Sequence, residues 1–306
     1  MSNVLIVGFG NIGKHHLESI INYPKIKKIY IYDIDEKKIL DYKKKSSFKK
    51  KIFILKNFKK KKTKFSFSII STDSKVRFKL FKNIVENLNV KHFIFEKVVY
   101  QKKKEYIDTQ KIIKKYNLHC WINCPRRTWK IYKDLKKKIN TKDKIKINIQ
   151  GKKWGLLSNA VHFIDLFLFF TFTKKMSVSL KNLKNEIIVS KRKGFNEMYG
   201  KIIFTNQNND QLIINDNPIR KKSDLIFSLK QNKYKFIYNQ NDSGNKFKPP
   251  YQSKETIKHA KNILNNKNCH LPFYNDTFEF HKIFFDNIST FIRKNYPNSY
   301  KKIFIT

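Results

Sequence analysis

Cysteine, proline, glycine and acidic residues are all scarce in this sequence. Its 306 residues include 3 Cys, 7 Pro, 8 Gly and 23 Asp or Glu. Three cysteines are too few for a disulfide framework. Cys120 and Cys124 lack the second pair or histidine cluster that would complete a zinc site. We therefore expect ordinary buried thiols and no metal centre.

The sequence also lacks a long apolar run. The longest candidate, residues 163–172, contains Asp165 and has about half of the roughly 20 residues that a membrane helix needs. The start, MSNVLIVGFG, has neither the basic leader nor the small-residue cleavage site of a signal peptide. We expect a cytoplasmic protein with no membrane partner.

Positive charge, by contrast, is abundant. The chain has 67 Lys and Arg residues and a formal net charge of +44. Such a charge suits a polyanion, because lysines neutralise phosphates and release counterions. However, only six of the basic residues are arginines, which read guanine and phosphate bidentately. The lysines are spread over a chain rich in Asn, Ile, Phe and Tyr, as drift toward AT-rich codons would produce. We expect no specific nucleic-acid partner, and a gel shift at physiological salt tests the polyanion alternative.

Strand-like and helix-like segments alternate in the first part of the chain. Short apolar runs predict strands at residues 4–9, 27–33, 51–55, 65–72, 91–97 and 118–124. Amphipathic stretches predict helices at residues 12–22, 35–45, 75–89 and 101–117. This alternation is typical of a doubly wound parallel sheet. We predict that residues 1–121 form an α/β Rossmann domain that binds NAD(P).

The pattern changes after residue 122. Helices are predicted at residues 128–140, 159–171, 253–265 and 276–295, and strands at 142–155, 177–183, 186–193, 197–216, 224–232 and 233–240. Asn, Asp and Gly turns join several of the strands, which favours antiparallel pairing. We predict that residues 122–306 form an α+β domain with a large, mostly antiparallel open sheet.

Three of the few glycines stand together in the opening stretch NVLIVGFGNIGKHH. A strand is predicted before them and a helix after them, the context of a dinucleotide-binding loop. Gly8 would allow the tight turn, Gly10 the approach of a pyrophosphate, and Gly13 the close packing of helix on strand. The phosphates would lie at the helix N-terminus, beside Asn11 and Ile12. The alternative is a structural turn in another kind of α/β protein.

Asp33 ends the second predicted strand, twenty residues after Gly13. A carboxylate at this point accepts hydrogen bonds from the adenosine ribose and repels a 2′-phosphate. We therefore expect NAD as the favoured cofactor. Lys37 and Lys38 lie close enough to leave NADP open.

Four motifs, in order, resemble those of the glucose–fructose oxidoreductase, inositol dehydrogenase and rhizopine-catabolism (Gfo/Idh/MocA) family. GFGNIGKHH resembles the family's GxGxxGxxH opening, and SIISTDSKVRF its fourth strand and following loop. HFIFEKV resembles the strand before its Glu-Lys-Pro signature, and WGLLSNAVHFIDLFLFF its helix with H-x-x-D. The resemblance covers nearly the whole chain. It implies a Rossmann domain, a second domain with a large open sheet, and a homo-dimer or homo-tetramer.

By position, the resemblance implies that Lys97 and His162 are catalytic. A lysine beside a carbonyl stabilises the alkoxide that forms during hydride transfer, and an imidazole can exchange the hydroxyl proton near neutral pH. Asp165 lies one turn after His162 and would orient the imidazole or bind a substrate hydroxyl. Without the resemblance, His162 would be read as a core histidine of an apolar helix. The positions implied at the cofactor are Ser71, Thr72 and Glu96.

Other positions point to the substrate. Arg127, with Arg126, would bind a phosphate or carboxylate as a fork, or form a surface pair. Trp154 and Asn159 stand in a stretch that resembles family members tied to surface-polysaccharide and unusual-sugar synthesis. A core position is the alternative for Trp154. The resemblance thus implies a sugar or nucleotide-sugar substrate.

The chain departs from the family pattern at several positions. Val98 and Asp73 replace prolines, Arg77 stands where a histidine is common, and Ser158 replaces an aspartate of the inositol branch. These departures argue against that branch. They leave two hypotheses, an NAD(P)-dependent sugar oxidoreductase and a cofactor-binding protein without turnover that is structural or regulatory.

Overall fold

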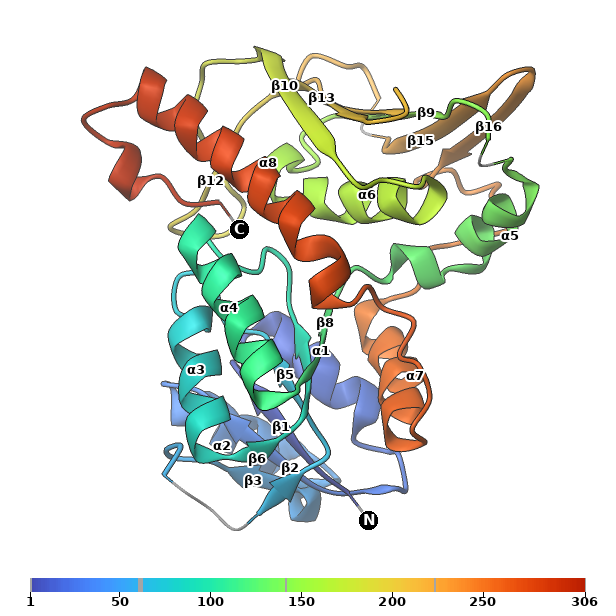
Figure 1. The fold of residues 1–306 in the computed structure, drawn as a ribbon. Helices are drawn as coiled ribbons and strands as arrows, with labels where there is room; N and C mark the ends of the chain where they lie inside the picture. The colour runs from blue at the N-terminus through green and yellow to red at the C-terminus, as the bar shows by residue number, and fades with distance from the viewer. Residues whose placement is uncertain (1, 60–62, 141, 223, 306) are drawn as a thin grey trace. The chain divides into compact units, whose positions relative to one another are not determined.

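The computed structural model describes residues 2–59, 63–140, 142–222 and 224–305. It divides the chain into two compact units, whose elements are labelled in Figure 1. The first unit comprises Met1–Tyr100, Lys104–Asn123 and Pro250–Asp276, and the second Gln101–Lys103, Cys124–Pro249 and Thr277–Thr306. The predicted boundary after residue 121 lies near the crossing at Asn123. The return of residues 250–276 to the first unit was not predicted.

A six-stranded parallel sheet forms the centre of the first unit. Its strands are β1 (Ser2–Val7), β2 (Ile26–Tyr32), β3 (Ile52–Ile54), β5 (Phe67–Ile70), β7 (His92–Phe95) and β8 (His119–Ile122). Their order is β3-β2-β1-β5-β7-β8, and every neighbouring pair is parallel. The strand order reverses between β1 and β5, and open α/β sheets bind ligands outside the strand ends at such a point. The predicted doubly wound sheet is confirmed.

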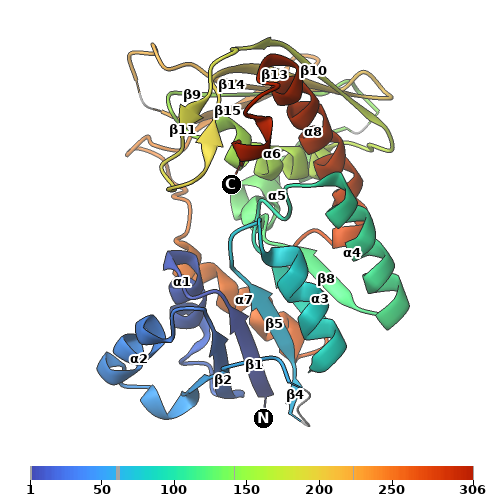
Figure 2. The ribbon, with the colours of Figure 1, turned by 90° about the vertical axis from the view of Figure 1, so that its left-hand side faces the viewer.

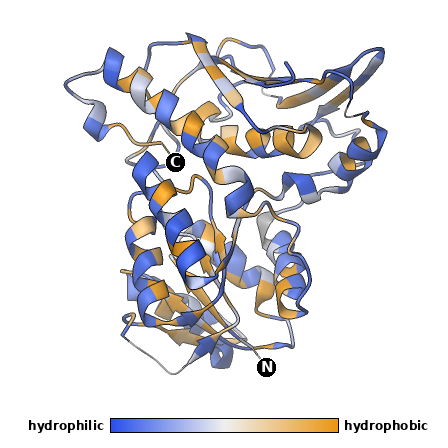
Figure 3. Cartoon of the chain, in the orientation of Figure 1, coloured by the Kyte–Doolittle hydropathy of each residue, from blue (hydrophilic) through white to orange (hydrophobic). Residues whose placement is uncertain are grey.

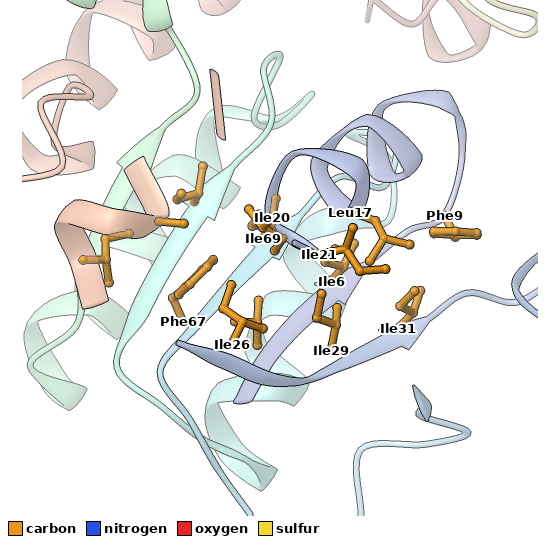
Figure 4. Close-up of a cluster of buried hydrophobic side chains, with 14 of the residues drawn as sticks. Ile6, Phe9, Leu17, Ile20, Ile21, Ile26, Ile29, Ile31, Phe67 and Ile69 are labelled. Atoms are coloured by element: carbon orange, nitrogen blue, oxygen red, sulfur yellow. The ribbon is translucent and has the colours of Figure 1, made fainter. Parts of the chain in front are cut away.

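Helices cover both faces of this sheet, because its strands are apolar on both sides. Helices α1 (Asn11–Ile20), α2 (Glu36–Lys45) and α7 (Gln252–Leu264) cover one face. Their buried side chains share one cluster with those of β1 and β2, part of which is drawn in Figure 4: Ile6, Leu17, Ile20, Ile29 and Ile31. Helices α3 (Arg77–Asn87) and α4 (Lys103–Tyr116) belong to the other face, where the Phe81 ring packs edge-on against Phe93 and Phe95.

The second unit has a six-stranded mixed sheet. Its strands are β9 (Lys146–Gly151), β10 (Met176–Leu183), β13 (Gly200–Asn206), β14 (Gln211–Asp216), β15 (Ile226–Gln231) and β16 (Tyr234–Asn239). Their order is β10-β13-β14-β9-β15-β16, and β9 and β14 are the parallel pair in an otherwise antiparallel sheet. The predicted α+β domain with a mostly antiparallel sheet is confirmed.

Helix α6 (Leu156–Phe170) packs against one face of this sheet (Figure 2). Buried and more exposed residues alternate along β9, β14 and β15, so that one side of each strand faces the helix. The helix is apolar around most of its surface, as Figure 3 shows, and ten of its side chains are buried. Burial of one such large apolar side chain contributes about 1.5–3 kcal/mol, so α6 anchors the core of the second unit.

The remaining elements are short or peripheral. Helices α5 (Lys130–Lys138) and α8 (Tyr274–Asn295) complete the α-helices of the described residues, with 3-10 turns η1 (Lys49–Lys51), η2 (Pro125–Thr128) and η3 (Tyr300–Lys302). Two small sheets pair β4 (Lys64–Phe65) with β6 (Asn89–Val90) and β11 (Ile188–Val189) with β12 (Asn196–Glu197). The strand predicted at 186–193 is thus only two residues long, because the segment after it is exposed. None of the helices in the described ranges is long and apolar enough to cross a membrane.

Candidate cofactor and catalytic site

The loop between β1 and α1 has the shape that a dinucleotide requires. Gly8 has φ +93°, and a Cβ there would lie 2.6 Å from the Thr72 backbone nitrogen. A Cβ on Gly13 would lie 2.1 Å from the Gly8 carbonyl oxygen. Gly10 has no heavy atom within 4 Å of its Cβ position, and no side chain caps the start of α1. The loop is therefore closed at Gly8 and Gly13, where the surrounding backbone leaves no room for a side chain. It is open at Gly10, beside the amides of Asn11 and Ile12, where no described residue occupies the space.

Asp33 joins this loop directly. Its Oδ2 accepts a hydrogen bond of 2.5 Å from the Phe9 amide, and its Oδ1 accepts one of 2.9 Å from the Asp35 amide. The carboxylate lies where β2 ends and touches the loop that follows β1. Ile34, the next residue, is 93% exposed. No role was predicted for Ile34 from the sequence, although it directly follows the acid.

Ser71 and Thr72 lie on the other side of the glycine loop, just after β5. The Ser71 hydroxyl donates a hydrogen bond of 2.8 Å to the Gly8 carbonyl. The Thr72 hydroxyl is buried and has no hydrogen-bond partner among the residues that the structure describes. The structure thus brings together Gly8, Gly13, Asp33, Ser71 and Thr72, five residues that the sequence analysis assigned to the cofactor.

Glu96, which follows β7, lies inside a buried polar network. Its Oε1 accepts a hydrogen bond of 2.9 Å from His16 Nε2 and another from the Asn123 amide. His16 Nδ1 lies 2.8 Å from the Thr256 hydroxyl on α7. Burial alone would raise the pKa of Glu96, but the hydrogen bonds of His16 and Asn123 and the charge of Arg77 lower it below its ordinary value. Glu96 is therefore an ionised anchor for the helix that follows the glycine loop.

No roles were predicted from the sequence for His16, Asn123 or Thr256. The histidine of the GxGxxGxxH pattern was a usable signal for His16. Nothing local in the sequence marks Asn123 or Thr256, because their contacts join residues 27 and 240 positions apart.

Lys97 is half-buried and lies between buried neighbours. Glu96 is 8% exposed, Val98 1% and Val99 fully buried. The peptide bond between Lys97 and Val98 is cis. Lys97 is therefore the one side chain of residues 96–99 that reaches toward the surface of the first unit.

In the second unit, Asp165 pairs with Arg127. The fully buried carboxylate accepts hydrogen bonds of 2.9 Å from Arg127 Nε and 2.5 Å from Nη2. Burial raises the pKa of Asp165 to about 6, and the Arg127 guanidinium opposes this shift. The fork predicted to bind a substrate anion thus holds a carboxylate of its own chain. The substrate role of Arg127 and the imidazole-orienting role of Asp165 stay predictions.

His162 lies on α6, one turn before Asp165, and is half-buried. The Arg126 guanidinium lies 4.7 Å from the ring of Phe163, the residue after His162, and 5.1 Å from the Trp129 ring. Burial lowers the pKa of Arg126, and Tyr132 opposes the shift. Lys97 and His162 belong to different units.

A cavity of about 280 Å³ lies at the start of α6. Residues that line it include Trp154, Ser158, Asn159, Glu197, Tyr199 and Asp216. An indole beside hydroxyl, amide and carboxylate groups suits a ligand with many hydroxyls. The predicted substrate residues Trp154 and Asn159 therefore share a cavity with Ser158.

Two carboxylates hold the walls of this cavity in place. Asp216 accepts hydrogen bonds from the Lys153, Trp154 and Gly155 amides at 2.6 to 3.2 Å. Glu197 accepts hydrogen bonds from two amides in the first turn of α6, at 2.8 and 3.0 Å. A negative charge is favourable at a helix N-terminus. No role was predicted from the sequence for either carboxylate.

The cysteines are all buried thiols. Burial raises the pKa of the Cys120 thiol well above its ordinary value and that of Cys269 to about 12. Thiols with raised pKa values are poor nucleophiles. Within the described ranges, no group of three or more His, Cys, Asp or Glu residues is arranged to hold a metal ion.

No protein-family model matches the sequence, and no curated protein matches it in sequence. Solved structures, in contrast, resemble the chain over nearly its whole length. scyllo-Inositol dehydrogenase from Lactobacillus casei, solved with NAD(H) and scyllo-inositol, has a TM-score of 0.69 and 16% identity over 93% of this chain and 95% of that chain. myo-Inositol dehydrogenase from the same organism, in complex with NAD(H) and myo-inositol, has a TM-score of 0.70 and 9% identity over 92% and 91%.

A third similar structure is the transcriptional regulator Gal80p from Kluyveromyces lactis. Its TM-score is 0.69 and its identity 14%, over 92% of this chain and 87% of that chain. Dehydrogenases and a regulator therefore share this architecture, and at these identities the likeness establishes the fold. The chain has the fold of the Gfo/Idh/MocA-type dehydrogenases, as its motifs predicted.

Proposed function

We propose that this protein is an NAD-dependent oxidoreductase that transfers a hydride between nicotinamide and a hydroxyl-bearing carbon of a sugar or nucleotide sugar. The single observation that carries the proposal is the glycine loop, closed at Gly8 and Gly13, open at Gly10, and bordered by Asp33. The structures of similar fold include two dehydrogenases solved with NAD(H) and an inositol. We place the activity in carbohydrate or surface-polysaccharide metabolism of the cytoplasm.

The residues of the first unit fit a nicotinamide dinucleotide. The pyrophosphate would be held by the amides at the start of α1, which no side chain caps. The Asp33 carboxylate has lone pairs left for ribose hydroxyls and would repel a 2′-phosphate, which favours NAD. Exposed Ile34 offers an apolar side chain to the adenine. The bound cofactor would supply the hydride chemistry.

The chain itself would handle the charge and the proton. Lys97 would donate a hydrogen bond to the substrate oxygen and stabilise negative charge there. His162 would accept the hydroxyl proton during oxidation and return it during reduction. Trp154 and Asn159, at the cavity that begins α6, would hold the sugar.

A second candidate function is cofactor binding without turnover. The fold that the chain shares with the regulator Gal80p favours it. Ser158 and Val98, which depart from the dehydrogenase pattern, favour it as well. In this case the protein would sense or store a dinucleotide.

Titration of the purified protein with NADH and with NADPH, followed by nicotinamide fluorescence, tests the first step. We expect saturable binding that is tighter for NADH than for NADPH. Asp33→Ala should reduce the ratio of these two affinities, because it removes the carboxylate that would repel a 2′-phosphate. Absence of saturable binding of either dinucleotide would remove both candidate functions. Tighter binding of NADPH would overturn the assignment of NAD.

Turnover with a panel of sugars, sugar alcohols and nucleotide sugars distinguishes the two candidates. We expect Lys97→Ala and His162→Ala each to lower kcat about 10²–10⁴-fold, the range for loss of a general acid or base. The fold-decrease in kcat of the double variant should be smaller than the product of the two single fold-decreases if both side chains act on one proton transfer. The exposed Lys233→Ala serves as the matched control. Dinucleotide binding without oxidation of any compound would favour the second candidate.

A further inference from the structure

Arg77, the first residue of α3, is a buried arginine that binds backbone carbonyl groups. It is 1% exposed. Its Nη1 donates to the carbonyl oxygens of Glu96 at 2.6 Å and Val99 at 3.0 Å, and also to that of Val98. Its Nη2 donates to the Thr72 carbonyl oxygen. One guanidinium thus connects the segment after β5 to the segment after β7.

The acceptors lie on both sides of Lys97. The carbonyls of Glu96, Val98 and Val99 all face the guanidinium, while the side chain of Lys97 is the more exposed one in this segment. Buried carbonyls without a donor are costly, and so is a buried cation without acceptors. Each side therefore satisfies the other, and a change in the backbone of residues 96–99 would break bonds to Arg77.

Few side chains can make this arrangement. Guanidinium offers five N–H donors in a planar, fixed fork. A neutral imidazole has a single N–H donor, and lysine concentrates its donors on one atom. Arg77 stands where a histidine is common in the family. Its guanidinium can therefore reach the segment after β5 and the segment after β7 at once.

We propose that Arg77 is a positioning residue that holds residues 96–99 against Thr72 and thereby sets the place of the Lys97 side chain. The catalytic consequence of this placement rests on the proposed function, because it assumes that Lys97 acts on the substrate. The role of Arg77 in holding residues 96–99 does not rest on the proposed function, since it concerns only contacts within the first unit.

The same guanidinium supports the neighbouring cofactor loop. Its charge favours the ionised form of Glu96, whose carboxylate accepts the hydrogen bond of His16 on α1. Thr72, which it also binds, lies beside Gly8. Loss of Arg77 should therefore loosen residues 96–99 first and the glycine loop only indirectly.

Hydrogen exchange followed by mass spectrometry tests the holding role. In Arg77→Lys and Arg77→Met, we expect the backbone amides of residues 97–100 to exchange at least about tenfold faster than in the wild type, as for a loop released from its anchor. Peptides from α6 should be unchanged, and Arg293→Lys, an exposed arginine of α8, is the matched control. If Arg77→Met fails to fold, Arg77→Lys carries the comparison. Unchanged exchange at residues 97–100 in a folded Arg77 variant overturns the proposal.

Kinetics test the consequence for Lys97. We expect Arg77→Lys to lower kcat about 10–100-fold with little change in KM or in NADH affinity, as a misplaced catalytic group does. Added guanidinium should restore part of the rate of Arg77→Ala, and an equal concentration of sodium chloride should not. An unchanged kcat with faster exchange refutes the positioning of Lys97. A wild type without turnover refutes the proposed function, and the exchange experiment still decides the role of Arg77.

Discussion

Asp165 and His281 are two buried ionisable residues of the second unit whose pKa values are shifted in opposite directions by the same cause. Burial raises the pKa of Asp165 to about 6 and lowers that of His281 to about 3. In both cases burial disfavours the charged form. The Arg127 guanidinium favours ionised Asp165 and further disfavours protonated His281. The two residues therefore make opposite contributions to the pH dependence of stability.

Substitution of His281 should reduce the sensitivity of the protein to acid. The folded-state pKa is below the unfolded value, so the unfolded state binds a proton first as the pH falls. The wild type should lose about 2 kcal/mol more free energy of unfolding than His281→Leu between about pH 7 and about pH 5. Urea unfolding at both pH values measures the difference. Equal pH dependence in the two proteins would mean that the histidine is solvated.

Substitution of Asp165 should have the reverse effect on the pH profile. Its folded-state pKa is above the unfolded value, so its contribution to stability is full below about pH 4 and lost as the pH rises to about 6. Relative to Asp165→Asn, the wild type should lose about 2 kcal/mol of its free energy of unfolding between about pH 4 and pH 7. Paired urea unfolding curves at about pH 4 and pH 7 provide the measurement. If the difference in free energy of unfolding between the two proteins does not vary with pH, Arg127 fully offsets the effect of burial on the carboxylate.

The sequence predicted which residues of the glycine loop lie together better than it predicted the partners of the buried polar groups. Gly8, Gly13 and Asp33 were assigned together from their spacing, and the structure places them together. The pairing of Asp165 with Arg127 was not predicted, because 38 residues separate them and no local pattern links them. The roles assigned to Lys97 and His162 stay predictions.

At the scale of elements, the two glycines at the start of α1 differ in what surrounds them. A Cβ at Gly13 would lie 2.1 Å from a backbone oxygen, whereas a Cβ at Gly10 would meet nothing within 4 Å. Gly10 has φ −73°, which any residue adopts. Packing therefore requires glycine at position 13, whereas only the proposed cofactor would require it at position 10.

The variants Gly13→Ala and Gly10→Ala should behave differently. Gly13→Ala should destabilise the fold by about 1–3 kcal/mol, as overpacking does, and abolish dinucleotide binding. Gly10→Ala should keep the wild-type melting temperature and lose at least about tenfold in NADH affinity, because its methyl group occupies the approach of the pyrophosphate. Thermal unfolding and fluorescence titration of both variants check this. Unchanged NADH affinity in Gly10→Ala would argue against the proposed cofactor site.

The order and type of the elements could be predicted because each element repeats a local pattern. Continuous apolar runs identified the parallel strands, helical spacing identified α1 and α3, and a long apolar stretch identified α6. Helix α7 was also predicted as a helix. Its membership of the first unit was not, because packing of Ala260 and Ile263 on the β1–β2 side of the sheet is a contact between distant segments.

At the scale of the whole molecule, the excess positive charge affects how two copies of the chain could associate into the predicted homo-oligomer. The sheet face of the second unit that does not face α6 carries Lys146, Lys201, Lys230 and Lys235 among polar side chains. Like charges brought together by face-to-face pairing repel each other, and salt screens this repulsion. Repulsion between the lysines of two copies would therefore oppose a dimer formed through this face.

Association through this face should therefore strengthen with ionic strength. We expect sedimentation velocity to show a larger dimer fraction at high than at low sodium chloride concentration. Lys230→Glu should raise the dimer fraction at low salt, and Lys102→Glu, an exposed lysine outside this face, is the control. If the dimer dissociates with added salt, or if Lys230→Glu leaves the dimer fraction unchanged, the interface does not lie on this face.

The sequence by itself determined the class of the fold, the dinucleotide-type loop and the acid that borders it. These features depend on residues close together in the chain, whose spacing follows from the geometry of strands, helices and turns. Only the tertiary structure decided that Arg77 binds the carbonyls around Lys97, that Arg127 binds Asp165, and that Glu96 binds His16 and Asn123. These contacts join segments that are far apart in sequence, and burial away from water makes each of their polar groups require a partner.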